Sequence, residues 1–144
     1  MEKRHSWRGR EWRGAGQCDS VSAMMRFEQL RAWQSAHRLA LAVYQVTESW
    51  PRREVYGLTS QTRRAAVSVP ANIAEGTAKL GKKEVARFLE TALASFTELT
   101  SLLRLSLDLG MMTSDEWQAL EQIREETGKL LWGLYWYVRC HAPK

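Results

Sequence analysis

Cysteine and histidine are scarce in this sequence of 144 residues. The two cysteines, Cys18 and Cys140, lie near opposite ends, and the three histidines are scattered along the chain. No CxxC or zinc-finger spacing joins them, so we predict neither a disulfide framework nor a metal site. Two unpaired thiols indicate a reducing compartment, which we expect to be the cytoplasm.

Long apolar runs are also missing. The longest one covers residues 130–138 and is interrupted by Gly133, whereas a membrane-spanning helix needs ~20 apolar residues. The first residues, MEKRHSWRGREWRG, are basic and contain no apolar stretch, so they do not resemble a secretory signal. We therefore expect a cytoplasmic protein that does not associate with a membrane.

The alternation of apolar and polar residues that marks a half-buried strand is absent as well. Hydrophobic residues make up 44% and charged residues 26% of the chain, which is typical of a globular protein. A chain of 144 residues is long enough for one domain with a single core. The sequence therefore predicts one all-α domain.

Positive charge is in excess. The formal net charge is +5, and the sequence pI is about 9.5. Such an excess suits an anionic partner, and nucleic acid is the usual one. A charge that only keeps the protein soluble is the alternative, and composition does not separate the two.

Residues 1–24 differ from the rest of the chain. They show no helical period, and they carry a net charge of +2 because five residues are basic and three are acidic. The segment is either a disordered basic extension that contacts nucleic acid or a translated leader ahead of a true start at Met24 or Met25. The helical period begins directly after Met25, which favours the second interpretation and places the domain at residues 25–144.

Apolar residues recur with a helical period in four segments of this domain. In the first segment, for example, Leu39, Val43, Val46 and Trp50 form one stripe. Amphipathic helices of this length with short connections predict an antiparallel up-down-up-down four-helix bundle. The expected helices cover residues 28–50, 58 to 76 or 80, 82–109 and 113–138.

Two helix starts carry capping signals. Thr59 or Ser60 is expected to cap the second helix with its hydroxyl group. Thr113 is followed three residues later by Glu116, which predicts a capping box at the start of the fourth helix.

Proline and glycine indicate where helices end or bend. Pro51 ends the first helix, because proline disfavours helical geometry at the residue before it. Pro70 lies inside the second helix and predicts a kink. Gly76 is a candidate C-cap of the second helix, and Gly110 ends the third.

Neighbouring arginines in the second helix are expected to have different roles. Side chains one residue apart on a helix point about 100° apart, so Arg63 and Arg64 do not serve one surface equally. We expect Arg64 to pair with Glu98 of the third helix, and Arg63 to point further out as a candidate phosphate contact. The predicted structural polar network consists of Arg64, Ser68, Asn72, Glu75, Ser95 and Glu98.

Two blocks of sequence resemble a known family. YGLTSQTRRAAVSVPANIAEG (residues 56–76) and KKEVARFLETALASFTEL (residues 82–99) are similar to the bacterial four-helix-bundle family found in intervening sequences of 23S ribosomal RNA genes. The resemblance covers about residues 26–138. The family pattern usually has Gly before the serine of the second block, where this chain has Ala94.

The resemblance implies a fold and an assembly more than a biochemical activity. Family members resemble four-helix bundles that form ring-shaped homo-oligomers, described as pentamers, and no enzymatic activity is established for them. The family is distantly related to the accessory variability proteins of diversity-generating retroelements. That branch is more basic than this chain and associates with nucleic acid and a reverse transcriptase.

A non-enzymatic homo-oligomer that binds RNA or DNA is the first functional hypothesis. A ring would repeat the basic cluster of each subunit around an axis, which matters because a few charges bind phosphate only weakly. The alternative for the same residues is a solvated basic turn. The candidate nucleic-acid contacts are Arg63, Lys79, Lys82, Lys83 and Arg87.

A protein-interaction scaffold is the second hypothesis, for example an accessory subunit of a reverse transcriptase or of another protein. Wide apolar surfaces on the first and fourth helices motivate it, including the aromatic cluster of residues 132–137, which favours an interface or core over base stacking. An enzyme is disfavoured, because no nucleophile or second carboxylate accompanies Asn72 and Glu75 at useful spacing. We therefore predict no catalytic residues and no cofactor.

Overall fold

The computed structural model describes residues 25–141, and in this range every regular element is helical. Two short 3-10 helices, η1 (Met25–Gln29) and η2 (Arg52–Glu54), accompany four long α-helices. The α-helices are α2 (Arg31–Thr47), α3 (Leu58–Thr77), α4 (Lys82–Asp108) and α5 (Ser114–Cys140). The predicted all-α fold is confirmed.

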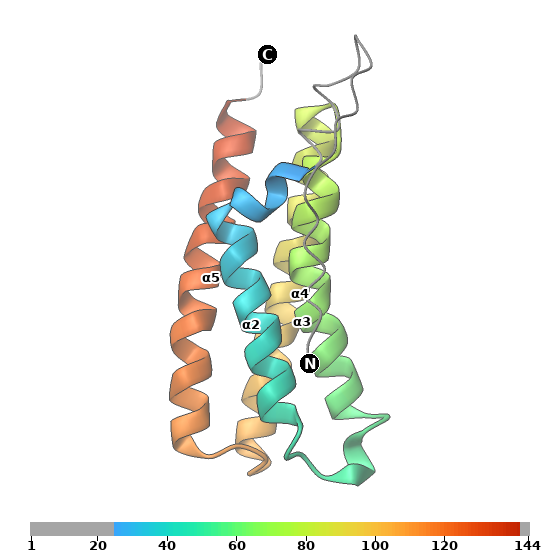
Figure 1. Cartoon of the computed structure of the whole chain (residues 1–144), viewed down its shortest axis with the longest axis vertical. Helices are drawn as coiled ribbons and strands as arrows, with labels where there is room; N and C mark the ends of the chain where they lie inside the picture. The colour runs from blue at the N-terminus through green and yellow to red at the C-terminus, as the bar shows by residue number, and fades with distance from the viewer. Residues whose placement is uncertain (1–24, 142–144) are drawn as a thin grey trace, which may run out of the picture.

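The four α-helices run antiparallel to their neighbours in sequence and form a bundle (Figure 1). α2 packs against α3 and α5, and α4 packs against the same two helices from the other side. The connections between the helices lie at the two ends of the bundle. One end holds the α3–α4 turn and the C-terminus of α5, and the other holds the α2–α3 and α4–α5 connections.

The hydrophobic core consists of two clusters along the bundle axis. One contains Leu39, Val43 and Leu103, and the other contains Ile73 and Leu131, all of them at most 1% exposed. The partly buried ring of Phe96 packs against both clusters and joins them. Truncating a fully buried leucine of this kind to alanine costs about 2–5 kcal/mol, so this core holds the four helices in place.

Two of the predicted helix boundaries are confirmed in detail. Thr113 Oγ1 accepts a hydrogen bond from Glu116 N at 3.2 Å, and Glu116 Oε2 accepts one from Thr113 N at 2.8 Å, which completes the capping box. Gly110 follows the end of α4 with φ of 73°. Met111 N donates to Ser106 O and Gly110 N donates to Leu107 O, both at 2.9 Å, which is the Schellman pattern that a left-handed glycine permits.

The predicted side-chain cap of α3 is wrong, although the helix starts at Leu58. Neither Thr59 nor Ser60 caps the helix; Gly57 occupies the N-cap position, and no side-chain cap is formed there. Instead, Glu54 Oε2 accepts a hydrogen bond from Leu58 N at 3.2 Å. A carboxylate from the preceding turn therefore satisfies a free N–H group at the positive end of the helix dipole.

The predicted role of Gly76 is also wrong. α3 continues through Gly76 to Thr77, and Gly76 is buried. A Cβ atom at this position would lie 3.1 Å from Phe88 Cβ, so the glycine permits close packing of α3 on α4 and does not end the helix. The helix also runs through the buried Pro70 without a break.

The first helix is shorter than the predicted range of residues 28–50. In the structure, α2 starts at Arg31 and ends at Thr47. Among the described residues, no helix is long and apolar enough to cross a membrane. The prediction of a basic extension or leader at residues 1–24 lies outside the described residues.

Candidate functional site

Four exposed basic side chains gather where α3 gives way to α4, and we call Lys79, Lys82, Lys83 and Arg87 the basic turn. Lys79 Nζ lies 4.8 Å from the centre of the Phe88 ring, a cation–π contact that holds this charge against the first turns of α4. Lys82 Nζ donates a hydrogen bond to a backbone carbonyl at the end of α5. No member of the basic turn forms an ion pair with a carboxylate of residues 25–141.

The basic turn borders a hollow between the start of α4 and the end of α5. Arg139 lines the same hollow and donates from Nη1 to the Tyr135 hydroxyl at 2.8 Å, and that hydroxyl donates to Glu90 Oε1 at 2.8 Å. The hydrogen bond with Tyr135 raises the pKa of Arg139. The lining carries four positive charges and two negative charges. The positive ones belong to Lys82, Lys83, Arg87 and Arg139, and the negative ones belong to Glu84 and Glu90.

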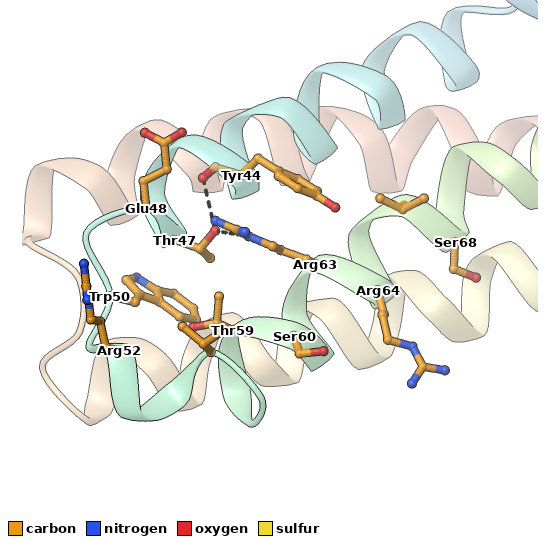
Figure 2. Close-up of a pocket in the computed structure, with 12 residues that line it drawn as sticks. Tyr44, Thr47, Glu48, Trp50, Arg52, Thr59, Ser60, Arg63, Arg64 and Ser68 are labelled. Carbon is orange, nitrogen blue, oxygen red and sulfur yellow. Dashed lines mark hydrogen bonds between the residues drawn. The ribbon is translucent and has the colours of Figure 1, made fainter.

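Arg63 lies away from the basic turn, in the half of α3 near the α2–α3 connection. Between Arg63 and Lys79 the helical rise is about 24 Å, so the structure splits the five predicted phosphate contacts into a cluster of four and a separate arginine. Arg63 Nε donates to Thr47 Oγ1 at 2.8 Å, and Thr47 Oγ1 donates to the Tyr44 carbonyl at 3.1 Å. The guanidinium carbon lies 4.6 Å from the centre of the Tyr44 ring. Figure 2 shows these contacts.

The predicted orientations of the two arginines are reversed. Arg63 is half-buried against α2, whereas Arg64 is exposed. The buried stripe of α3 includes Thr62, Ala66 and Val69, and this phase places Arg63 at its flank and Arg64 on the opposite side of the helix.

Part of the predicted polar network is linked by hydrogen bonds. The Ser68 and Ser95 hydroxyl oxygens lie 2.8 Å apart, and Asn72 Nδ2 donates to the Ser68 carbonyl at 2.8 Å and to its hydroxyl at 3.0 Å. Arg64 and Glu98 line a neighbouring hollow. Within residues 25–141 they form no ion pair, and the exposed Glu75 forms none either.

Exposed aromatic side chains lie on the C-terminal half of α5. Trp132, Trp136 and Tyr137, which we call the aromatic face, are 52%, 46% and 63% exposed. The Trp132 and Trp136 rings meet edge to face with centroids 5.8 Å apart, so they support each other on the surface. Tyr135, which belongs to the same predicted cluster, is instead buried in the core.

Sequence reasoning missed a second hollow, between the end of α2 and the start of α3 (Figure 2). Its lining includes Tyr44, Trp50, Thr59 and Arg63, and we call it the α2–α3 hollow. These residues come from two helices and the connection between them, so no spacing along the chain groups them. Within residues 25–141, no three His, Cys, Asp or Glu side chains are placed to hold a metal ion.

The comparison with protein families gives one match. The profile described as 23S rRNA-intervening sequence protein matches residues 28–133. The matched range starts just before α2 and ends within α5, so it takes in the basic turn and most of the bundle. A search of curated proteins found no match. Because the match covers well over half of the chain, this protein belongs to the 23S rRNA-intervening sequence protein family.

Proposed function

We propose that this protein is a non-enzymatic, cytoplasmic bundle that binds the phosphate backbone of RNA or DNA through the basic turn. The observation that carries the proposal is the grouping of Lys79, Lys82, Lys83 and Arg87, all exposed and without an ion pair among residues 25–141. Exposed lysines on flexible stems suit a backbone contact that does not depend on sequence.

The bundle has other arginines, but several of them already face carboxylates. Arg38 pairs with Glu126 at 2.9 Å, and Arg104 pairs with Asp108 at 3.3 Å. Their charge is partly neutralised where they lie, which makes these two arginines poorer phosphate contacts than the basic turn.

Homo-oligomer formation is part of the proposal. A single basic turn offers about four phosphate contacts, and each contact adds only about 0.9 to the slope of log affinity against log salt concentration. A ring of subunits would repeat the site and raise the affinity by multivalency. The aromatic face of α5 supports such an assembly, because exposed tryptophan and tyrosine are enriched at protein interfaces. A pentamer is the assembly we expect from the family.

A charge-neutralised variant of the basic turn tests this function. We expect Lys82→Gln/Lys83→Gln/Arg87→Gln to weaken binding of structured RNA and duplex DNA at least about tenfold at low salt. The measurement is fluorescence anisotropy with labelled nucleic acid.

The matched control removes three exposed arginines elsewhere on the bundle, in the variant Arg38→Gln/Arg53→Gln/Arg104→Gln. It has the same net charge as the test variant, so a general charge effect weakens both proteins equally. Equal weakening would contradict the proposal, and only a selective loss in the basic-turn variant supports it.

A protein scaffold, such as an accessory subunit of a reverse transcriptase or another protein, is the second candidate. The observation that favours it is the same aromatic face on α5. Sedimentation of Trp132→Ala/Trp136→Ala separates the two uses of this face. If the variant dissociates into smaller species, the aromatic face takes part in self-assembly. If the variant keeps the oligomeric state of the unaltered protein, the aromatic face is available to bind a different protein.

A further inference from the structure

The α2–α3 hollow has unsatisfied polar groups in its lining. Trp50 and Thr59 are each only 5% exposed, and both line the hollow. Trp50 Nε1 and Thr59 Oγ1 are buried and have no hydrogen-bond partner among residues 25–141. An unpaired buried donor costs about 1–3 kcal/mol, so two such groups in the lining of one hollow require a physical explanation.

The same hollow is rich in positive charge. Arg52, Arg63 and Arg64 line it together with one carboxylate, that of Glu48. None of these arginines forms an ion pair within residues 25–141. Figure 2 shows the Arg52 and Arg64 side chains pointing away from Arg63, so Arg63 is the arginine that an anion in the hollow would contact.

Arg63 is oriented before any ligand arrives. Its Nε atom donates a hydrogen bond to Thr47 Oγ1 at 2.8 Å, and its guanidinium group lies against the Tyr44 ring. The two terminal nitrogens form no hydrogen bond with the described residues. They present a planar pair of donors, the geometry that carboxylate and phosphate oxygens accept in a bidentate manner.

Part of the lining is apolar. Val55 and Val67 are each 46% exposed, and Tyr44 is 42% exposed. Small-molecule sites typically combine apolar walls with a few fixed polar groups. A bare inorganic ion would leave these walls uncovered, so the lining fits an anion that carries an apolar body.

We propose that the α2–α3 hollow binds a small organic anion, in which a carboxylate or phosphate group is attached to an aromatic body. The oxyanion accepts hydrogen bonds from Arg63, and one of its oxygens also accepts from the Trp50 indole N–H. The aromatic body packs against Tyr44, Val55 and Val67. Because Trp50 Nε1 is buried, binding requires a small movement of the exposed side chains of the lining.

This site is separate from the basic turn, which lies toward the other end of the bundle. Its failure would leave the nucleic-acid proposal untouched, and the reverse also holds.

The test is a titration of the full chain followed by two-dimensional ¹H–¹⁵N NMR of the indole N–H groups. The chain has seven tryptophans, and the Trp50→Phe variant identifies the Trp50 resonance. The probes are phenyl phosphate and phenylacetate, with benzyl alcohol as the uncharged analogue and inorganic phosphate as the ion without a ring. We expect a saturable shift of the Trp50 resonance with at least one of the two aromatic anions, and at least about tenfold weaker binding of both controls.

The relative affinity of the two aromatic anions identifies the oxyanion, because tighter phenyl phosphate indicates a phosphate ligand and tighter phenylacetate indicates a carboxylate ligand. Arg63→Lys keeps the charge but loses the planar donor pair, so we expect about tenfold weaker binding. Arg53→Gln removes a neighbouring arginine that does not line the hollow and should leave the affinity unchanged. Val67→Glu places a negative charge on an exposed wall without disturbing the core, and it should weaken binding in a folded protein.

A Trp50 resonance that does not move with either aromatic anion would overturn the proposal. The same holds if benzyl alcohol binds as tightly as the anions, or if Arg63→Lys and Val67→Glu both bind like the unaltered protein.

Discussion

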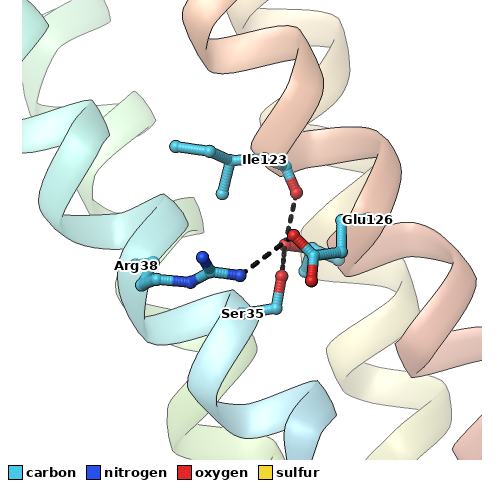
Figure 3. Close-up of polar contacts among 5 residues, drawn as sticks. Ser35, Arg38, Ile123 and Glu126 are labelled. Carbon is cyan, nitrogen blue, oxygen red and sulfur yellow. Dashed lines mark hydrogen bonds and ion pairs between the residues drawn. The ribbon is translucent and has the colours of Figure 1, made fainter.

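A buried pair of hydroxyl groups between α2 and α5 allows a quantitative test of the bundle (Figure 3). Ser35 Oγ and Thr127 Oγ1 lie 2.8 Å apart, and Thr127 Oγ1 donates to the Ile123 carbonyl at 2.7 Å. Because a hydroxyl group has one hydrogen, Ser35 must be the donor to Thr127. The two side chains are 1% and 0% exposed, so water does not replace a lost partner.

The two single substitutions are therefore not equivalent. Ser35→Ala removes one hydrogen bond and leaves the Thr127 hydroxyl satisfied, which should cost about 1 kcal/mol. Thr127→Val keeps the shape of the side chain but leaves the Ser35 hydroxyl buried without its acceptor, which should cost about 2–3 kcal/mol. The double variant has no unsatisfied donor, so its cost should be about 1 kcal/mol. The two positions are then coupled by about −2 kcal/mol.

Urea denaturation monitored by circular dichroism, at one fixed protein concentration, measures the four free energies of unfolding. For a slope of about 2 kcal/mol per molar urea, Thr127→Val lowers the midpoint by roughly 1 M, and Ser35→Ala lowers it by roughly half as much. Equal costs for the two single variants, or costs that simply add in the double variant, would refute the assigned direction of the hydrogen bond.

Three further changes have defined outcomes. Gly133→Ala should raise the free energy of unfolding by about 1 kcal/mol, because a Cβ atom there meets no atom of the described residues within 4 Å, and thermal unfolding checks this. Gly76→Ala should lower it by about 1–2 kcal/mol despite the better helix propensity, because the new Cβ would lie 3.1 Å from Phe88 Cβ; a stabilised variant would contradict the close packing of α3 on α4. Glu121→Gln removes the ion pair with Arg124, whose hydrogen bond lowers the pKa of Glu121 below 4.5. At pH values where Glu121 is ionised, the pair stabilises the fold by at most about 1 kcal/mol. The difference in the free energy of unfolding between the unaltered protein and Glu121→Gln should therefore vanish as the pH falls through the lowered pKa. Urea denaturation at pH 7 and in acid measures this difference.

Local signals in the sequence predicted much of the fold. The capping box at Thr113 and the glycine at position 110 depend on residues close together in the chain, so their roles are visible without a structure. The same holds for the stripe of Leu39, Val43 and Val46, which is buried as predicted.

Errors arose where a residue's role depends on a different element. Gly76 looks like a helix stop, but its role comes from Phe88 of α4. The start of α3 depends on a carboxylate from η2, that of Glu54, and not on the hydroxyl groups that follow. For Gly76 a tertiary contact replaced the local signal, and for the start of α3 a different local contact did so, from a carboxylate four residues before Leu58.

The candidate sites divide in the same way. The basic turn could be predicted because Lys79, Lys82, Lys83 and Arg87 lie within nine consecutive residues. The α2–α3 hollow could not, because Trp50 and Arg63 meet only after α2 and α3 have packed.

The salt dependence of nucleic-acid binding tests the central claim most directly. Affinity for duplex DNA is measured at several salt concentrations for the unaltered protein and for Lys82→Gln/Lys83→Gln/Arg87→Gln. If these three side chains contact phosphates, the variant should reduce the slope of log affinity against log salt concentration by about 2.7 for each basic turn engaged, which corresponds to three lost contacts. An unchanged slope, or an unaltered protein that does not bind at low salt, would contradict the claim.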